Sequence, residues 1–267
     1  MPLDFVHGCL EVLVFLGLGY SLRHLTSEAL EELKTADVIY IDTYTSLYED
    51  PYVKIAEINP RAECIYASRR DLEGPSVSKV LEKASTKKVV IAVPGDPFIA
   101  TTHDAILIEA LKRGIHVKIV NGISFITMAY SRLGLQSYRF GKHVTLVYPK
   151  FFKPYSTIEV IYDNLSRNLH TIVLLELNIE ESKAMTIQEA VEILLELDYE
   201  RKLRSALALG IARLGWRDEK ICGGLLPDVR KYEYPPPPHS IIVLGKLSPI
   251  EEEFFEYWKK ACSNKVS

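Results

Sequence analysis

The sequence predicts an α/β protein with two α/β domains, a mostly parallel first sheet and a mixed second sheet. In the first half, short β-branched apolar runs alternate with amphipathic stretches. This alternation is typical of parallel strands that helices cover on both faces. In the second half, the apolar runs 207–213 and 221–225 are separated by only a short turn around Gly215, which predicts antiparallel pairing.

The chain has 267 residues, which is long enough for one large or two modest domains that each bury a core. Apolar density falls between Leu135 and Lys142. A fall of this kind is typical of a domain junction, so we expect a first domain at 1–135 and a second at 136–267. A hydrophobic fraction of 48% with 25% charged residues is typical of a soluble globular protein.

Charge and cysteine usage exclude several classes of protein. A net charge of −3 gives no basic field for nucleic acid or an anionic membrane, and no apolar run has the length of a membrane span. The first residues lack the pattern of a secretory leader, so we expect a cytosolic protein. The cysteines are far apart in sequence and no histidine pair has ligand spacing, so we expect neither a metal site nor a disulfide framework. They are Cys9, Cys64, Cys222 and Cys262.

The first half contains five apolar runs that predict strands and four stretches that predict helices, after an extension at 1–11. The helix from 26 is capped by Thr26, and Thr101 or Thr102 caps the helix that Gly114 ends. The run 116–120 alternates, as a half-exposed edge strand does. The expected strands are 12–16, 38–41, 64–66, 89–93 and 116–120, and the expected helices are 26–35, 76–84, 103–112 and 125–132.

The second half predicts further strands and three helices. Thr186 and Glu189 have the spacing of a capping box, and Ser248 precedes a final acidic helix. Four prolines at 235–238 predict a stiff polyproline II connector that holds His239 in a fixed place, either simply as a rigid link or at the wall of a cleft. The expected strands are 144–148, 171–177, 207–213, 221–225 and 240–244, and the expected helices are 157–168, 187–197 and 249–260.

Polar or glycine-rich turns follow several strands of the first half, and the sharpest is Pro94-Gly95-Asp96-Pro97. Ligands of open α/β sheets bind at the carboxyl ends of the strands, although such a turn also occurs for purely structural reasons. A nicotinamide-binding Rossmann site fits poorly, because Leu22 occupies the third glycine position and the next helix starts too late, near Thr26. A Walker loop and a Gly-x-Ser-x-Gly elbow are also absent from the sequence. The residues alone therefore predict a two-part α/β protein with a ligand cleft.

The order of several motifs resembles that of the diphthine synthases, a family of the tetrapyrrole-methylase fold of class III methyltransferases. A Gly-Asp-Pro turn marks the wider fold, whereas Ala-Thr-Thr-His after it and Tyr-Thr-Ser upstream favour the diphthine synthases over corrin and porphyrin methylases. The usual Gly-Pro-Gly-Asp is replaced by Gly-Leu-Gly-Tyr. The motifs are Gly17-Leu18-Gly19, Tyr44-Thr45-Ser46, the segment 94–103, Phe140-Gly141-Lys142, and Pro237-Pro238-His239 with Gly245-Lys246-Leu247.

This resemblance implies an S-adenosylmethionine-dependent methyltransferase that forms S-adenosylhomocysteine. It would methylate the amino group of the aminocarboxypropyl-modified histidine of translation elongation factor 2, a step of diphthamide biosynthesis. The alternatives are a tetrapyrrole methyltransferase of the same fold and a scaffold with a decayed cofactor site. The family also implies a homodimer. The number of methyl groups added, the general base and the docking surface for the factor are not readable from the chain.

The resemblance places the cofactor in a cleft between the two domains. His103 is a candidate catalytic residue or, equally, a helix-cap histidine. Arg69, Arg70 and Lys142 are candidates to meet the carboxylate of the acceptor. The residues implied as cofactor contacts are Tyr20, Asp96, Ile99, Ser124, Phe125, Leu175, Ala212 and His239.

Overall fold

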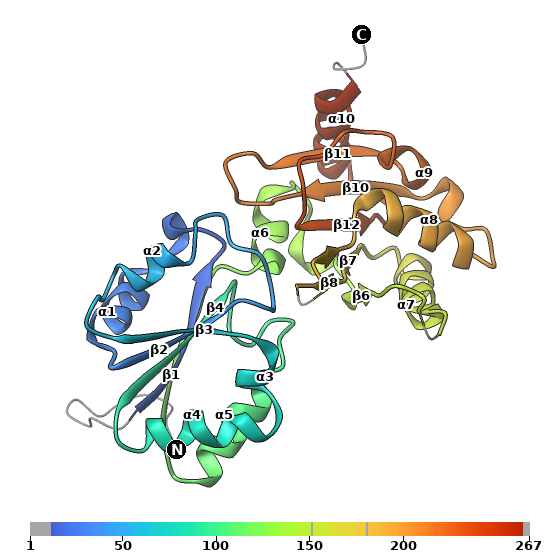
Figure 1. Ribbon diagram of the computed structural model, residues 1–267. Helices are drawn as coiled ribbons and strands as arrows, with labels where there is room; N and C mark the ends of the chain where they lie inside the picture. Colours follow the sequence, from blue (N-terminus) through green and yellow to red (C-terminus); the bar gives the residue numbers. More distant parts are fainter. Residues whose placement is uncertain (1–11, 151, 180, 264–267) are drawn as a thin grey trace. The chain divides into compact units, whose positions relative to one another are not determined.

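The computed structural model describes residues 12–150, 152–179 and 181–263, and the extension expected at 1–11 lies outside them (Figure 1). Contacts divide the chain into two compact units, Met1–Ser124 and Phe125–Ser267. None of the helices in the described part is long and apolar enough to cross a membrane.

Helix α6 (Phe125–Arg132) belongs to the second unit, whereas the boundary expected at 135/136 places it in the first. The segment after α6 is fastened to helix α10 (Pro249–Ser263): Trp258 Nε1 donates to Leu133 O (3.1 Å), and Gln136 N donates to a Glu251 carboxylate oxygen (3.0 Å). The two units therefore differ from the expected domains by this one helix. The sequence placed α6 in the first domain because it continues the alternation of strands and helices of the first half.

The first unit contains a five-stranded sheet in which every pair of neighbouring strands is parallel, as predicted. The strand order is β3-β2-β4-β1-β5, so β5 is an edge strand and its partial exposure agrees with the alternation of its residues. The strands are β1 Val12–Gly19, β2 Val38–Asp42, β3 Glu63–Ala67, β4 Lys88–Pro94 and β5 His116–Val120.

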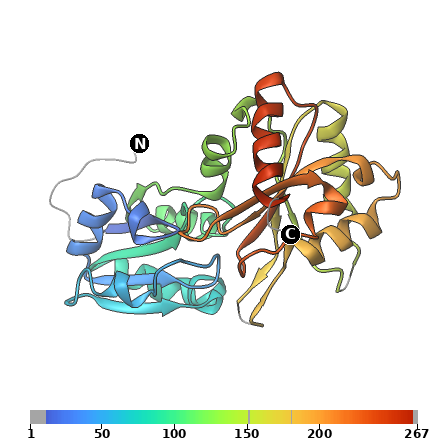
Figure 2. The same ribbon diagram turned by 90° about the horizontal axis from the view of Figure 1, so that it is seen from above.

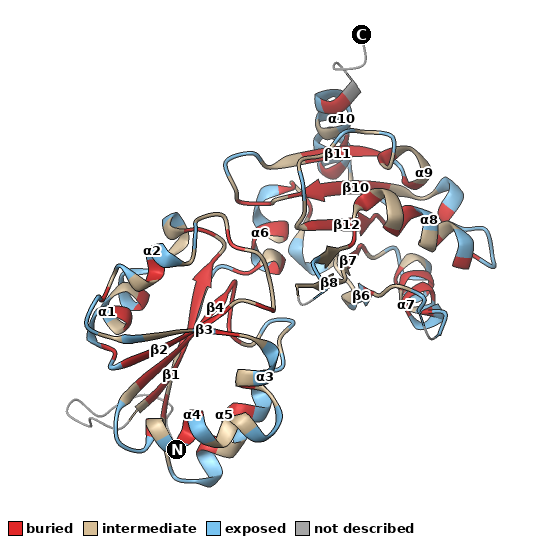
Figure 3. Cartoon of the chain, viewed as in Figure 1, coloured by how far each residue is buried: buried red, intermediate tan, exposed pale blue. Residues whose placement is uncertain are grey.

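Helices cover both faces of this sheet, which explains why its central strands β1, β2 and β4 are apolar along most of their length (Figure 1, Figure 3). Leu13 and Phe15 pack on the face of α4 and α5, and Val14 and Leu16 pack on the face of α1 and α2. The helices are α1 Ser27–Thr35, α2 Val53–Ala56, α3 Arg69–Leu72, α4 Val77–Ala84 and α5 Asp104–Lys112, with 3-10 turns η1 Leu22–His24 and η2 Gly74–Ser76.

The helix caps of this unit were only partly predicted. Thr26 caps α1 by accepting a hydrogen bond from Ala29 N (3.0 Å), and Gly114 follows α5 with a left-handed φ of 70°, both as expected. The expected cap of α5 by Thr101 or Thr102 is wrong: the cap residue is His103, which has helical backbone angles and makes no side-chain cap. Both threonines instead bind groups in the loops around them.

The second unit contains a mixed sheet with the order β11-β10-β12-β7-β6, in which only β6 and β7 are parallel. This confirms the mixed second sheet and the antiparallel pairing predicted for strands 207–213 and 221–225. The strands are β6 Val144–Leu146, β7 Thr171–Leu175, β10 Leu207–Ala212, β11 Lys220–Leu225 and β12 His239–Val243, with a small hairpin of β8 Leu177–Asn178 and β9 Lys183–Ala184.

Helices α7, α8 and α9 pack on one face of this sheet, and α10, the red helix of Figure 2, packs against β11. The capping box of α8 is confirmed, because Thr186 Oγ1 accepts from Glu189 N (3.2 Å) and Glu189 accepts from Thr186 N (2.9 Å). The remaining elements are α7 Tyr155–Ser166, α8 Ile187–Leu197, α9 Leu226–Val229, η3 Ser137–Arg139 and η4 Leu203–Ser205.

Cys222 on β11 and Cys262 near the end of α10 form a disulfide across 40 residues of sequence. The expectation that the chain has no disulfide is therefore wrong for this pair. Sequence spacing gave no signal because the two cysteines meet only when α10 packs against β11. Cys64 is a free, partly buried thiol, and Cys9 lies outside the described residues.

Candidate active site

The carboxyl ends of β1, β4 and β5 pack backbone against backbone. Gly19 N donates to Gly95 O (3.1 Å) and Gly95 N donates to Gly19 O (2.6 Å). A Cβ at Gly17 would lie 2.4 Å from Gly122 Cα, and a Cβ at Gly122 would lie 2.0 Å from Gly95 O. The Gly-x-Gly of β1 is therefore needed for this close approach, which places three strand ends at one edge of the sheet.

Asp96 fastens the turn after β4 to the loop after β5. One carboxylate oxygen accepts from Phe98 N (3.0 Å), and the other accepts from Asn121 Nδ2 (3.0 Å) and Gly122 N (3.1 Å). The side chain is only 4% exposed. Asp96 therefore accepts three hydrogen bonds from the protein itself, and these bonds fix the two loops at this edge of the sheet before any ligand is bound. Sequence reasoning missed Asn121, whose one signal was its position at a strand end.

The other proposed cofactor contacts of the first unit lie at the same edge. Tyr20 follows β1, and its hydroxyl would lie 2.8 Å from a Cβ at Gly95, so its ring covers that glycine. Ile99 is 39% exposed in the loop after β4, and Ser124 is buried after β5. These groups fit a small cofactor, because glycine backbone, a half-exposed aliphatic side chain and a phenol ring adjoin one turn.

The proposed contacts of the second unit also share a sheet edge. Ala212 ends β10 and is paired with His239, the first residue of β12. Strand β12 runs antiparallel to β7, with Ser240 opposite Leu174, so Leu175 at the end of β7 lies at the same edge. Phe125, the remaining contact, opens α6. The fold therefore brings together three residues that are far apart in the sequence.

Both ring nitrogens of His239 make hydrogen bonds within the second unit. Nδ1 accepts from Ile187 N (3.2 Å) at the start of α8, and Nε2 donates to Pro235 O (2.7 Å). Burial lowers the pKa of His239, which agrees with a neutral ring that accepts at one nitrogen and donates at the other. A cofactor contact of His239 would therefore use its backbone.

Arg213 holds the proline segment that precedes His239. Its Nε donates to Pro236 O (2.6 Å), and its backbone N donates to Pro238 O (2.9 Å). The segment bends at Pro236 and contains a cis peptide between Pro237 and Pro238, so it is not the straight rod that four prolines predict. Arg213 was read from the sequence only as the end of a strand.

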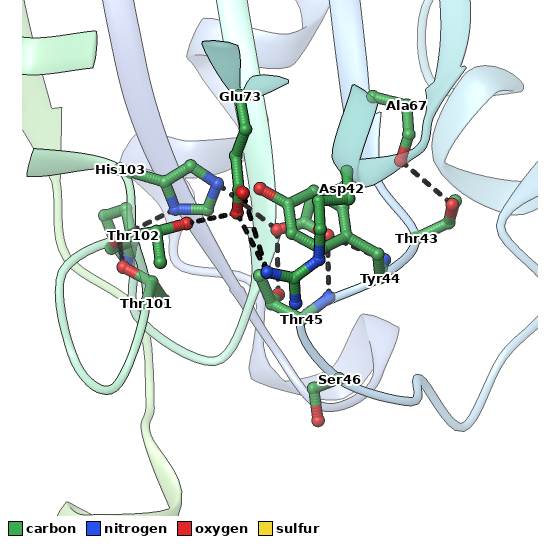
Figure 4. A network of polar contacts seen from close by, with 12 residues as sticks. Asp42, Thr43, Tyr44, Thr45, Ser46, Ala67, Glu73, Thr101, Thr102 and His103 are labelled. Carbon is green, nitrogen blue, oxygen red and sulfur yellow. Dashed lines mark hydrogen bonds and ion pairs between the residues drawn. The ribbon is translucent and has the colours of Figure 1, made fainter. Parts of the chain in front are cut away.

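A polar cluster lies beside the turn after β4 and joins three segments of the first unit (Figure 4). Asp42 and His103 are fully buried, with His103 Nε2 3.3 Å from an Asp42 carboxylate oxygen. The guanidinium group of Arg69 lies 5.2 Å from the ring centroid of Tyr44 and 3.3 Å from the carboxylate of Glu73. Desolvation of the Tyr44 hydroxyl, helped by the charge of Asp42, raises its pKa to about 12. Among the described residues, no cluster of side chains has the make-up of a metal site.

A parallel sheet followed by a mixed sheet is the arrangement that the motif resemblance implies, and a family comparison identifies the class. The family model for tetrapyrrole (corrin/porphyrin) methylases matches residues 12–230. Within this class, the chain is 53% identical to the diphthine synthase of Staphylothermus marinus over 92% of this chain and 93% of that protein.

Two further relatives agree. The diphthine synthase of Saccharolobus solfataricus is 37% identical over 93% of this chain and 98% of its own length. A crystal structure of diphthine synthase superposes with a TM-score of 0.85 at 33% identity, covering 93% of this chain and 96% of the other. The chain belongs to the diphthine synthase family, as the resemblance of its motifs predicts.

Proposed function

We propose that this protein uses S-adenosylmethionine to methylate the amino group of the aminocarboxypropyl-modified histidine of translation elongation factor 2, giving diphthine. The observation that carries the proposal is the 53% identity, over more than nine tenths of both chains, with a diphthine synthase. The activity is therefore a step of diphthamide biosynthesis.

The proposed cofactor contacts come from both units. S-adenosylmethionine supplies a methyl group on a sulfonium, ready for transfer to a nucleophile. Ile99, which is 39% exposed, offers the cofactor an apolar contact beside the glycine-lined strand ends. The full proposed set is Tyr20, Asp96, Ile99, Ser124, Phe125, Leu175, Ala212 and His239.

The protein's part in the reaction is to position the acceptor and exclude water. The amine nitrogen must approach in its neutral form and in line with the breaking carbon–sulfur bond, so much of the rate can come from alignment. As the new carbon–nitrogen bond forms and the carbon–sulfur bond breaks, the amine becomes cationic, and its proton passes to bulk solvent after the transfer. His103 and His239 are both buried and hydrogen-bonded internally, so we assign neither of them the role of base.

Arg69 is the proposed contact for the carboxylate of the aminocarboxypropyl group. Its side chain is 53% exposed, and its guanidinium group is held over Tyr44 and beside Glu73. A planar guanidinium group fixed in this way can bind a carboxylate with two parallel hydrogen bonds. The adjacent Arg70 is also exposed and serves as a natural comparison.

The test is mass spectrometry of elongation factor 2 that carries the intermediate, after incubation with this protein and labelled S-adenosylmethionine. We expect labelled methyl groups on the modified histidine and none on factor that lacks the intermediate. A tetrapyrrole precursor in a parallel reaction should remain unmethylated. Label on the tetrapyrrole alone would overturn the proposed substrate and favour the other branch of the class.

We also propose that the protein is a cytoplasmic homodimer. Its protein substrate acts in translation, which supports a cytoplasmic location, and the resemblance to the family supports a dimer. Analytical ultracentrifugation of the purified protein at several concentrations tests the dimer, and a single monomeric species would overturn it.

A further inference from the structure

His103 links two loops of the first unit from inside the protein. Its Nδ1 lies 3.1 Å from Pro97 O, and since a carbonyl only accepts, Nδ1 carries the hydrogen of this bond. Its Nε2 lies 3.3 Å from an Asp42 carboxylate oxygen without hydrogen-bond geometry, and both side chains are fully buried. Figure 4 shows His103 and Asp42 side by side within this cluster.

Asp42 in turn holds the loop after β2. Its carboxylate accepts hydrogen bonds from Tyr44 N (2.8 Å), Thr45 N (3.0 Å) and Thr45 Oγ1 (2.7 Å). A single buried carboxylate therefore fixes the Tyr-Thr-Ser loop and, through His103, contacts the end of the Pro-Gly-Asp-Pro turn. This connects the two motifs whose combination distinguishes this family.

The loop from Pro97 to His103 needs such support. Ala100 has a φ of 59°, a left-handed conformation that residues with a Cβ adopt only where their surroundings enforce it. Thr101 Oγ1 and His103 Nδ1 both donate to Pro97 O, at 2.5 Å and 3.1 Å, and so close the loop upon itself. Ile99, a proposed cofactor contact, lies inside the closed loop.

A second layer of contacts supports the same loop from its exposed side. Thr102 Oγ1 donates to the carboxylate of Glu73 (2.8 Å), which is also paired with Arg69 over the ring of Tyr44. The buried and exposed layers connect the same two loops, so the loop that carries Ile99 is held on both sides.

We propose that His103 is a positioning residue that holds the cofactor-binding loop through Pro97 O and packs it against Asp42, and so keeps Ile99 and the Pro94–Pro97 turn ready for S-adenosylmethionine. This inference rests on the proposed function in that the loop after β4 binds the cofactor. It assigns His103 no proton transfer, because the ring is fully buried and both nitrogens face groups of the protein.

Three variants separate the two contacts of the ring. In His103→Asn, the amide can replace Nδ1 and keep the bond to Pro97 O, whereas in His103→Gln it can replace Nε2 and keep the contact with Asp42. His103→Ala loses both. We expect the affinity for S-adenosylhomocysteine, measured by calorimetry, to fall by about tenfold or more in His103→Ala and by less in the two amide variants.

Thr101→Val removes the other hydrogen bond to Pro97 O and leaves the buried pair intact. We expect it to weaken S-adenosylhomocysteine binding in the same direction, which keeps the proposal testable if His103→Ala folds poorly. The matched control is His116→Asn, at the first residue of β5 and therefore at the opposite end of the sheet from the site; its affinity should equal that of the unchanged protein.

The kinetic readout separates positioning from other roles. Positioning predicts a raised KM for S-adenosylmethionine with an unchanged KM for the elongation factor. A general base would instead lower kcat and shift its pH profile while S-adenosylhomocysteine binding stayed intact, and a merely structural residue would lower Tm without changing affinity per folded molecule. Either result would overturn the positioning role.

These outcomes also distinguish this inference from the proposed function. Equal S-adenosylhomocysteine affinity in the unchanged protein, His103→Ala and Thr101→Val would overturn the positioning role alone. Failure of the unchanged protein to bind S-adenosylhomocysteine would overturn both proposals. Cofactor binding without methylation of the elongation factor would overturn only the proposal that the elongation factor is the methyl acceptor.

Discussion

The two sheet edges that carry the proposed site hold their loops by opposite chemistry. In the first unit, the carboxylates of Asp42 and Asp96 accept hydrogen bonds from backbone N–H groups of the loops. In the second unit, Arg213 and His239 donate to carbonyl groups of the 235–238 segment. The difference follows from composition: proline has no N–H, so a run of prolines offers a neighbouring side chain only acceptors.

The comparison shows that the type of side chain that orders a loop depends on which backbone groups of that loop lack a backbone partner. Carboxylates suit loops with free amides, such as those containing Tyr44 and Gly122, and guanidinium or imidazole groups suit the prolines. Removing a residue of either kind should therefore loosen its own loop, with a larger effect where more hydrogen bonds are lost.

The largest effect is expected for Asp96→Ala, which leaves three donors without their acceptor. Stability should fall by about 3 kcal/mol or more, because partly buried donors lose a charged partner, and S-adenosylhomocysteine affinity should fall by about tenfold or more. Chemical denaturation and calorimetry measure the two effects. Asp96→Asn is the control, since it keeps one accepting oxygen and should lose less. Full stability and affinity in Asp96→Ala would contradict the structural part we assign to this carboxylate.

Glu251 tests whether a carboxylate also orders loops in the second unit. If free backbone amides decide which side chain orders a loop, a carboxylate should do so in either unit. In the second unit this buried carboxylate accepts from Gln136 N (3.0 Å) and Ser248 N (2.8 Å), two loop amides. Burial alone would raise its pKa, but the bonds from Ser248, Gln136 and His170 lower it to about 2. The pKa in the folded protein lies below the usual value of 4.5, so the stabilisation is present above pH 4.5 and is lost as the pH falls towards 2.

The expected size of this loss is about 3 kcal/mol, from the pKa shift at 1.36 kcal/mol per unit. Other acids titrate in the same range, so the measurement is the difference between the unchanged protein and Glu251→Gln in denaturation experiments between about pH 5 and about pH 2. The stability curves should converge at the acidic end. Parallel curves would show that Glu251 titrates normally.

A smaller effect is expected for Arg213→Ala, which removes the bond to Pro236 O and the pair with Asp218 (2.6 Å). The loss should be about 2 kcal/mol, typical of a charged donor to a carbonyl. Thermal unfolding of Arg213→Lys is the control, because lysine keeps the charge but lacks the planar fork that reaches both groups. Equal stability of all three proteins would show that the prolines hold their own shape.

The sequence predicted the strands of the first unit well, because burial on both faces leaves uninterrupted apolar runs such as β1 and β4. It also predicted the capping box at Thr186, since that signal is local. The four-residue helices α2 and α3 were missed because one turn shows no periodicity. The disulfide of Cys222 was missed because its partner is distant in the sequence.

For the candidate site, the sequence indicated which turns matter but not what their side chains do. Asp96 was expected to face a ligand, yet its partner Asn121 follows a different strand and approaches only in the folded sheet. His103 and Asp42 likewise come from separate segments, so neither spacing nor composition could pair them. Contacts between loops require the strand order, which local patterns do not encode.

The smallest effect is expected for Arg69→Ala, at the exposed layer over Tyr44. Its pair with Glu73 is half exposed and contributes little to stability, so Tm should barely change. If Arg69 binds the acceptor carboxylate, KM for the elongation factor should rise by about tenfold with cofactor affinity unchanged. Arg70→Ala, one residue along the same exposed turn, should leave KM unchanged. Equal KM values for both variants would remove Arg69 from the acceptor site. Arg69 would then only support the loops from outside, through Glu73 and Tyr44, as Asp42 and His103 do from inside.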